Sequence, residues 1–148
     1  MLLVNRGHDF ECSRRALAET HDRGILTCGH IILGLPGESA EDNIRQSEVV
    51  SNLKLDILKL HQLQIIKGTQ LAEEYCREPF KLYSADEYID LCIRYLERLR
   101  NNIIVERFVS QSPADMLIAP KWGLKNYEFT NRLVNEMKRR GTWQGRLV

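Results

Sequence analysis

Hydrophobic residues recur every three or four positions in some segments of the chain and run almost without interruption in others. The first pattern is typical of helices with one buried face, and the second of strands buried in a sheet. The patterns predict helices over residues 9–23, 40–53, 69–77, 84–99 and 124–140, strands over residues 25–33, 55–66 and 103–109, and a loop that holds Pro113, Pro120 and Trp122 ahead of the last helix. Strands that alternate with helices in this way are typical of a parallel sheet, so an α/β layer or barrel is expected.

The segment ILTCGHIILGLPGE, residues 25–38, is an apolar run that ends in a glycine- and proline-rich turn. Its isoleucines and leucines leave no polar face, which predicts a strand buried on both sides. Ser39 and Asp42 then form a capping-box pair that begins a helix. Ligands of α/β folds bind where strand ends, glycine backbones and helix N-termini meet, so this turn is a candidate site. A structural strand–turn–helix with nothing bound is the alternative.

Similar local signals bound the other helices. Thr69 is a candidate N-cap for the short helix, and Ser84 with Glu87 is a second capping box ahead of the most regular helix of the chain. Gly24 and Gly141 follow the first and last helices, where glycine commonly ends a helix.

Composition and charge place the chain among ordinary globular domains. Its 148 residues are 43% hydrophobic, enough to bury a core, and its net charge of +1 argues against a surface that coats nucleic acid. No apolar run approaches the roughly 20 residues that cross a bilayer, and residues 1–4 are too short an apolar stretch for a signal peptide, so we expect a cytoplasmic protein without membrane contacts. The four cysteines have no metal-binding spacing and are expected to be core residues.

Three parallel strands are too few for a self-sufficient sheet, because two long apolar edges would remain open. We therefore expect either part of a larger domain or a chain that covers its strand edges by forming homo-oligomers. No internal repeat or linker indicates a second domain, so residues 1–148 are expected to form a single one.

Four segments carry a family resemblance: NRGHD at residues 5–9, HIILGLPGE at 30–38, KLHQLQIIKGT at 59–69 and LIAPKW at 117–122. In order and spacing they resemble the C-terminal part of radical S-adenosylmethionine (radical SAM) proteins, in particular YhcC-like proteins related to the Elongator catalytic subunit and to oxygen-independent coproporphyrinogen oxidases. The resemblance implies an incomplete TIM-type barrel. Residues of about 1–100 would carry its fifth and sixth strands, and about 101–148 the family's C-terminal helical extension.

The resemblance also implies cofactors. Relatives hold a [4Fe-4S] cluster through cysteines near the start of the barrel, and this chain has no counterpart of that segment. It would contribute to S-adenosylmethionine binding in a longer iron–sulfur oxidoreductase, with the missing N-terminal half as its partner. By itself we expect it to be inactive and to bind neither the cluster nor S-adenosylmethionine. The substrate is not implied.

Six residues match positions that contact S-adenosylmethionine in relatives. Arg6 would pair with the carboxylate, His30 would meet the ribose hydroxyls, and Ile32 and Gly34 would pack against adenine. Gln62 and Leu63 would offer backbone hydrogen bonds to adenine, although the side chains of Gln62 and His61 could face the substrate instead. The structural alternatives are a surface arginine for Arg6, a satisfied core histidine for His30 and a core isoleucine for Ile32.

A second hypothesis is a non-catalytic interaction module that retains the barrel-derived fold and pairs its strand edge with a partner. The C-terminal segment adds the possibility of RNA binding, because cations there alternate with aromatic residues. A solvated helix face explains the same charges. The cations concerned are Lys125, Arg132, Lys138, Arg139, Arg140 and Arg146.

Overall fold

A computed structural model describes residues 7–148 of the chain. The elements follow in the order α1 (Phe10–His21), β1 (Cys28–Leu33), α2 (Ala40–Ser51), β2 (Ile57–Gln62), β3 (Ile65–Ile66), α3 (Gln70–Arg77), α4 (Ala85–Glu97), β4 (Ile104–Arg107), β5 (Leu117–Ala119) and α5 (Asn126–Arg140). Strands β1, β2 and β4 form a parallel sheet in that order. The predicted α/β class with parallel strands is confirmed, and over the described residues the sheet is open, as expected of an incomplete barrel.

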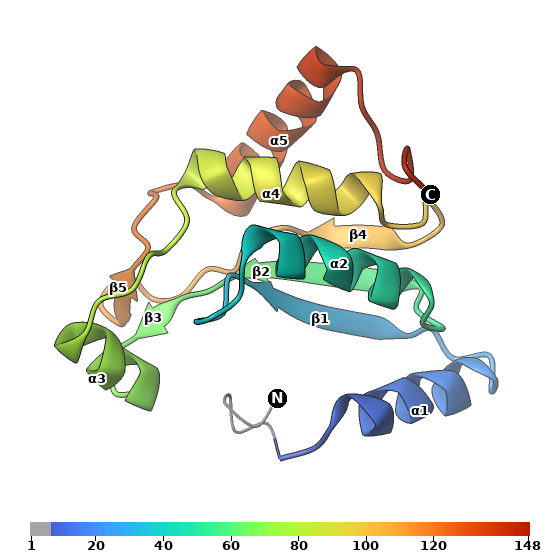
Figure 1. Cartoon of the computed structure of the whole chain (residues 1–148), viewed down its shortest axis with the longest axis horizontal. Helices are drawn as coiled ribbons and strands as arrows, with labels where there is room; N and C mark the ends of the chain where they lie inside the picture. The colour runs from blue at the N-terminus through green and yellow to red at the C-terminus, as the bar shows by residue number, and fades with distance from the viewer. Residues whose placement is uncertain (1–6) are drawn as a thin grey trace.

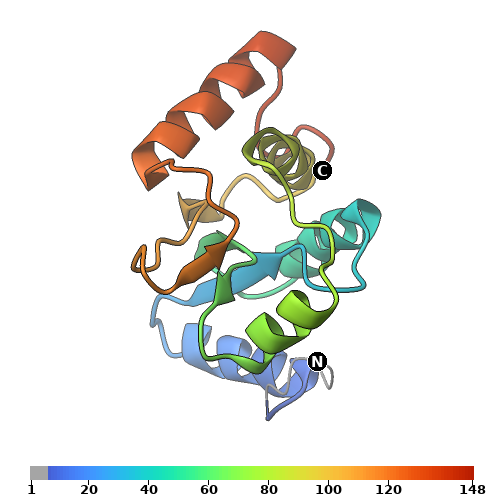
Figure 2. The same ribbon diagram turned by 90° about the vertical axis from the view of Figure 1, so that its left-hand side faces the viewer.

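Helices α2 and α4 cover one face of the sheet, α5 packs on α4, and α1 lies beside β1 (Figure 1). The β3–β5 pair and α3 stand together at the end of the sheet where β2 finishes, as Figure 2 shows from the side. One face of the sheet is therefore packed, and within residues 7–148 no helix lies over most of the opposite face.

The main core lies between the sheet and α4. Leu58 and Leu60 of β2 are fully buried there against Tyr88 and Tyr95 of α4. The Tyr88 hydroxyl donates to the carbonyl oxygen of Phe108, just beyond β4, at 3.0 Å. The apolar face predicted for this helix is thus the face that forms the core.

Helix boundaries agree with the capping signals. The Asp9, Thr69 and Ser84 side chains each accept a hydrogen bond from the first turn of α1, α3 and α4, and Ser39 with Asp42 forms the predicted capping box of α2. Gly141 ends α5 with a left-handed φ of 62°.

The prediction that β1 is buried on both sides is wrong. Cys28, His30 and Ile32 are exposed while the residues between them are partly or fully buried, and Leu26, ahead of the strand, is 74% exposed. The reason is position: β1 is an edge strand, and only its packed face meets α2 and the core. The side chains on the other face of β1, Ile32 among them, are therefore exposed despite the apolar sequence of the strand.

Two further predictions need correction. The single strand predicted over residues 55–66 is divided into β2 and β3, and β3 pairs antiparallel with β5, which lies inside the predicted loop. The pair is held by a second small core around Ile65, which is completely buried. Of the cysteines, only Cys92 is a core residue; the other three, Cys12, Cys28 and Cys76, are exposed.

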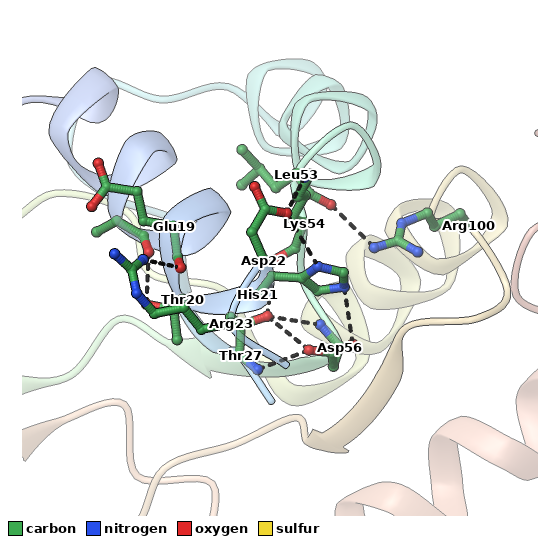
Figure 3. A network of polar contacts seen from close by, with 11 residues as sticks. Glu19, Thr20, His21, Asp22, Arg23, Thr27, Leu53, Lys54, Asp56 and Arg100 are labelled. Atoms are coloured by element: carbon green, nitrogen blue, oxygen red, sulfur yellow. Dashed lines mark hydrogen bonds and ion pairs between the residues drawn. The ribbon is translucent and has the colours of Figure 1, made fainter. Parts of the chain in front are cut away.

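A polar network ties the N-terminal ends of β1 and β2 together (Figure 3). The Asp56 carboxylate accepts from the Thr27 backbone N–H at 2.8 Å and from the Thr27 hydroxyl at 3.0 Å, and these hydrogen bonds lower the Asp56 pKa. The Arg100 guanidinium donates to the carbonyls of Leu53 and Leu55 in the segment that enters β2. This end of the sheet is fixed by interactions within the chain, at the opposite end of the strands from the GLPGE turn.

None of the helices built from the described residues is both long and apolar enough to cross a bilayer.

Candidate cofactor-binding face

The turn after β1 is closed by its own backbone and by Asn43. Gly34 has a φ of +85°, and its N–H donates to the buried Asn43 side-chain oxygen at 2.8 Å. A Cβ built on Gly34 would lie 2.9 Å from the Tyr83 ring. Glycine is therefore needed at this position both for its backbone angle and for the close approach of Tyr83.

Gln62 and Leu63 lie where β2 ends, beside the end of β1. The Gln62 side-chain amide donates to the Ser110 carbonyl at 2.9 Å and accepts from the Ser110 N–H at 2.8 Å, so it links β2 to the segment after β4. The Leu63 N–H donates to the Leu33 carbonyl at 3.2 Å, and its side chain lies in the second core. The side chains of both residues are thus engaged within the chain.

The open face of the sheet carries the remaining site residues. His30 and Ile32 of β1 stand on this face beside Lys59 and His61 of β2, their partners in the strand register. Ile32 is 45% exposed, which makes it an uncovered apolar contact at the C-terminal end of the strand. The alternative that Ile32 is a core isoleucine does not describe this position.

His30 and His61 stack with ring centroids 5.3 Å apart and planes inclined by 15°. The His61 Nε2 atom is buried and has no hydrogen-bond partner among the described residues. Burial, followed by the nearby charges of His30, Arg107 and Lys59, lowers the His61 pKa. His61 thus stands on the open face with one buried ring nitrogen whose hydrogen-bonding position is unused.

Of the six predicted cofactor contacts, five lie within or just after β1 and β2. His30 and Ile32 share the open face, while Gly34, Gln62 and Leu63 lie where these strands end. Arg6 falls outside the described residues. The grouping of the five described residues follows from the parallel register of β1 and β2. Their contact with a cofactor stays a prediction.

Two features were missed from the sequence. Lys59 precedes His61 by two residues on β2 and Arg107 lies on the neighbouring strand β4, and the only local signal was a charged residue within each apolar run. A cleft of about 540 Å³ opens beyond the ends of β2 and β4, lined among others by Gln64, Ser112 and Trp122. The cleft depends on β5 and the segment after it, which the sequence indicated only as a loop.

No group of three or more His, Cys, Asp or Glu side chains suited to a metal ion lies among residues 7–148. The cysteines are on separate elements and, apart from buried Cys92, are exposed. These residues do not fit the three-thiolate donor set that an iron–sulfur cluster of this kind needs.

Comparison with known proteins shows what the chain is similar to. Residues 55–139 match the radical SAM C-terminal domain. The uncharacterized protein MJ0486 of Methanocaldococcus jannaschii is 34% identical over 97% of this chain and 45% of its own length. Protein YhcC of Escherichia coli is 30% identical over 80% of this chain and 38% of its own. The chain thus spans less than half the length of these relatives.

Among solved structures, the archaeal Elp3 of Methanocaldococcus infernus, with its N-terminus deleted, superimposes with a TM-score of 0.83 over 96% of this chain and 33% of that protein. At 24% identity this likeness establishes the fold alone. The predicted resemblance to YhcC-like proteins is confirmed by the YhcC match. That to the Elongator catalytic subunit is confirmed by Elongator complex protein 3 of Saccharomyces cerevisiae, 32% identical over 63% of this chain and 17% of its own length.

Proposed function

The chain belongs to the radical SAM proteins that carry the radical SAM C-terminal domain, and we propose that it forms the C-terminal part of an S-adenosylmethionine site. One observation carries the proposal: the parallel register gathers the matching residues that the structure describes within and just after neighbouring strands, beside a sheet face that the described helices leave mostly uncovered. Barrel proteins place their ligands at this end of the strands.

Each described residue has a role that its surroundings allow. Ile32 offers an exposed apolar side chain to the adenine ring, and His30, two residues earlier on the same face, offers a ring nitrogen to the ribose hydroxyls. Gly34 lets the chain turn sharply beside adenine, with Tyr83 packed behind it. Gln62 and Leu63 contribute backbone groups, because their side chains are used within the chain. For Leu63 the group is the carbonyl oxygen, since its N–H already donates to the Leu33 carbonyl.

Arg6, outside the described residues, would complete the set by pairing with the carboxylate through its planar guanidinium. In the family, a reduced [4Fe-4S] cluster supplies the electron that cleaves S-adenosylmethionine. Residues 7–148 do not fit that cluster, so we assign them no redox step. Their part is to bind and orient the nucleoside portion of the cofactor.

The cluster would be held by a partner, which we propose is an N-terminal half of the same protein. A groove of about 540 Å³ runs between α1 and the free edge of β1, and it is lined by apolar side chains such as Phe10, Leu17 and Leu26. A preceding barrel strand that pairs with this edge would cover it. Light scattering on the 148-residue chain tests this, because a stable homodimer would indicate that a second copy covers the edge instead.

The cofactor site is tested by comparing Ile32→Asn with Ile104→Asn in the complete, cluster-loaded protein. Both isoleucines are exposed on the open face, but Ile104 pairs with Ile57 at the opposite end of the strands. Losing the contact of Ile32 with adenine should cost about 1–2 kcal/mol, which is roughly a tenfold weaker binding of S-adenosylmethionine by equilibrium dialysis. Ile104→Asn should bind normally. Equal affinities in the two variants would exclude Ile32 from the site.

The structure gives less support to RNA binding through the C-terminal cations. Arg139 and Arg140 both pair with Glu136, and Arg140 also contacts Asp90 at 2.6 Å. Arg139 and Arg140 are therefore poorly available to phosphates, which favours the solvated helix face at the C-terminal end of α5.

A further inference from the structure

The open face of the sheet carries a concentration of basic groups that the proposed cofactor contacts do not use. Lys59 and His61 of β2, His30 of β1 and Arg107 of β4 lie next to one another across three strands. Glu106 is the one acidic side chain paired with any of them among the described residues, through Lys59 Nζ at 3.0 Å.

A bulge in β4 creates this arrangement. Leu58 lies opposite Val105, but the next residue, Lys59, lies opposite Arg107, so Glu106 is an extra residue in the ladder. Such bulges redirect side chains and are common beside functional sites. Here the bulge brings the Arg107 side chain level with Lys59, while Glu106 still reaches the lysine.

Two groups in this cluster have unused binding capacity. Arg107 forms no ion pair with any residue in the described part of the chain, although it is only partly exposed. The His61 Nε2 atom is buried without a partner, and buried polar atoms normally have one. Arg107 is near enough to His61 for its charge to lower the His61 pKa, so an acceptor that enters between the two side chains would satisfy both.

From this geometry we propose that His61, Arg107 and Lys59 form a binding site for an oxyanion, the phosphate or carboxylate group of a small molecule. Guanidinium and imidazole donors suit the oxygens of such a group, and a partly buried lysine adds charge at short range. The lowered pKa of His61 agrees with this arrangement, because an anion would offset the positive charges of the neighbouring Arg107 and Lys59 that contribute to the lowering.

The site also has a place in the proposed reaction. Ile32, the proposed adenine contact, is the register partner of His61. A substrate held through its anionic group would therefore lie beside S-adenosylmethionine. The inference that this site holds the substrate rests on the proposed function, whereas the inference that it binds an oxyanion does not.

NMR of the histidine ring protons tests the site in the 148-residue chain without S-adenosylmethionine. Inorganic phosphate and succinate are titrated separately, with sodium chloride at matched ionic strength as the reference. We expect saturable shifts of His61 and His30 with at least one of the two anions, and a rise in the His61 pKa on binding. His21, at the opposite end of the strands, should not shift. Saturation with phosphate alone would identify a phosphate site, and with succinate alone a carboxylate site.

Variants decide whether the cluster is responsible. Arg107→Gln should weaken binding at least tenfold, and His61→Gln should weaken it as well, with backbone amide spectra that show the fold retained. Arg132→Gln is the matched control, since Arg132 is exposed on α5 away from the sheet. Shifts that never saturate, that His21 shares, or that persist unchanged in both site variants would overturn the proposal. None of these outcomes depends on S-adenosylmethionine, so a failure here leaves the cofactor proposal standing.

Discussion

Replacing Gly34 by alanine should destabilise the protein more than the same change at Gly37, three residues later in the same turn. Both glycines have positive φ, +85° and +83°, and the left-handed backbone costs an alanine about 1–2 kcal/mol. Only at Gly34 does the new Cβ meet a neighbour, the Tyr83 ring at 2.9 Å. Crowding of this kind adds about 1–3 kcal/mol. We therefore expect a loss of about 2–5 kcal/mol for Gly34→Ala and about 1–2 kcal/mol for Gly37→Ala.

Urea unfolding followed by far-ultraviolet circular dichroism measures both losses of stability, provided that the slope of the free energy of unfolding against urea concentration is the same in each variant. A double-mutant cycle with Tyr83→Ala separates the contact from the backbone strain, because the Gly34 and Tyr83 changes should be strongly coupled. Equal losses for the two glycine variants, or additive effects of the Gly34 and Tyr83 changes, would refute the close approach as the reason for glycine.

Two further stability predictions concern the hydrogen bonds of the Tyr88 hydroxyl and the Asp56 carboxylate. Tyr88→Phe should lower the free energy of unfolding by about 1–2 kcal/mol in urea melts, because it removes the hydrogen bond to the buried Phe108 carbonyl; an unchanged midpoint would contradict this. Asp56→Asn should be destabilising at pH 7, because the Thr27 hydrogen bonds lower the Asp56 pKa in the folded state. That contribution is present above the ordinary value of 3.8 and is lost as the pH falls below it. Thermal melts of the two proteins should therefore converge as the pH drops below 3.8, and a constant difference would be inconsistent with the linkage.

The helices could be predicted because their signals are local. The Ser39–Asp42 and Ser84–Glu87 pairs each span a single turn, and the capping boxes form as expected. The apolar spacing of α4 likewise appears on its buried face, with Tyr88 fully enclosed. Such patterns depend on neighbours in the sequence and little on the rest of the fold.

The sheet could be predicted only in part, because burial of a strand depends on what covers it. The apolar sequence of β1 gave no sign that Ile32 would be exposed, since edge and central strands of a parallel sheet can have the same composition. β5 is three residues long and is followed by Pro120, so its pairing with β3 had no local pattern.

The candidate site also contains residues that could be predicted from the sequence and residues that could not. Residues within and after β1, such as His30 and Gly34, could be found because they belong to a contiguous segment with a recognisable turn. The grouping of Lys59 with Arg107 could not, because it depends on a bulge that shifts the register between strands far apart in the sequence.

The central claim is that S-adenosylmethionine lies at the ends of β1 and β2. Hydrogen–deuterium exchange on the complete, cluster-loaded protein tests this most directly, with and without S-adenosylmethionine. The account predicts slower exchange on binding in peptides that cover residues 30–34 and 61–63, and no change around the Thr27–Asp56 network at the other end of the strands. Protection confined to residues 120–125, beside the cleft beyond β2 and β4, or to peptides outside this chain would contradict it.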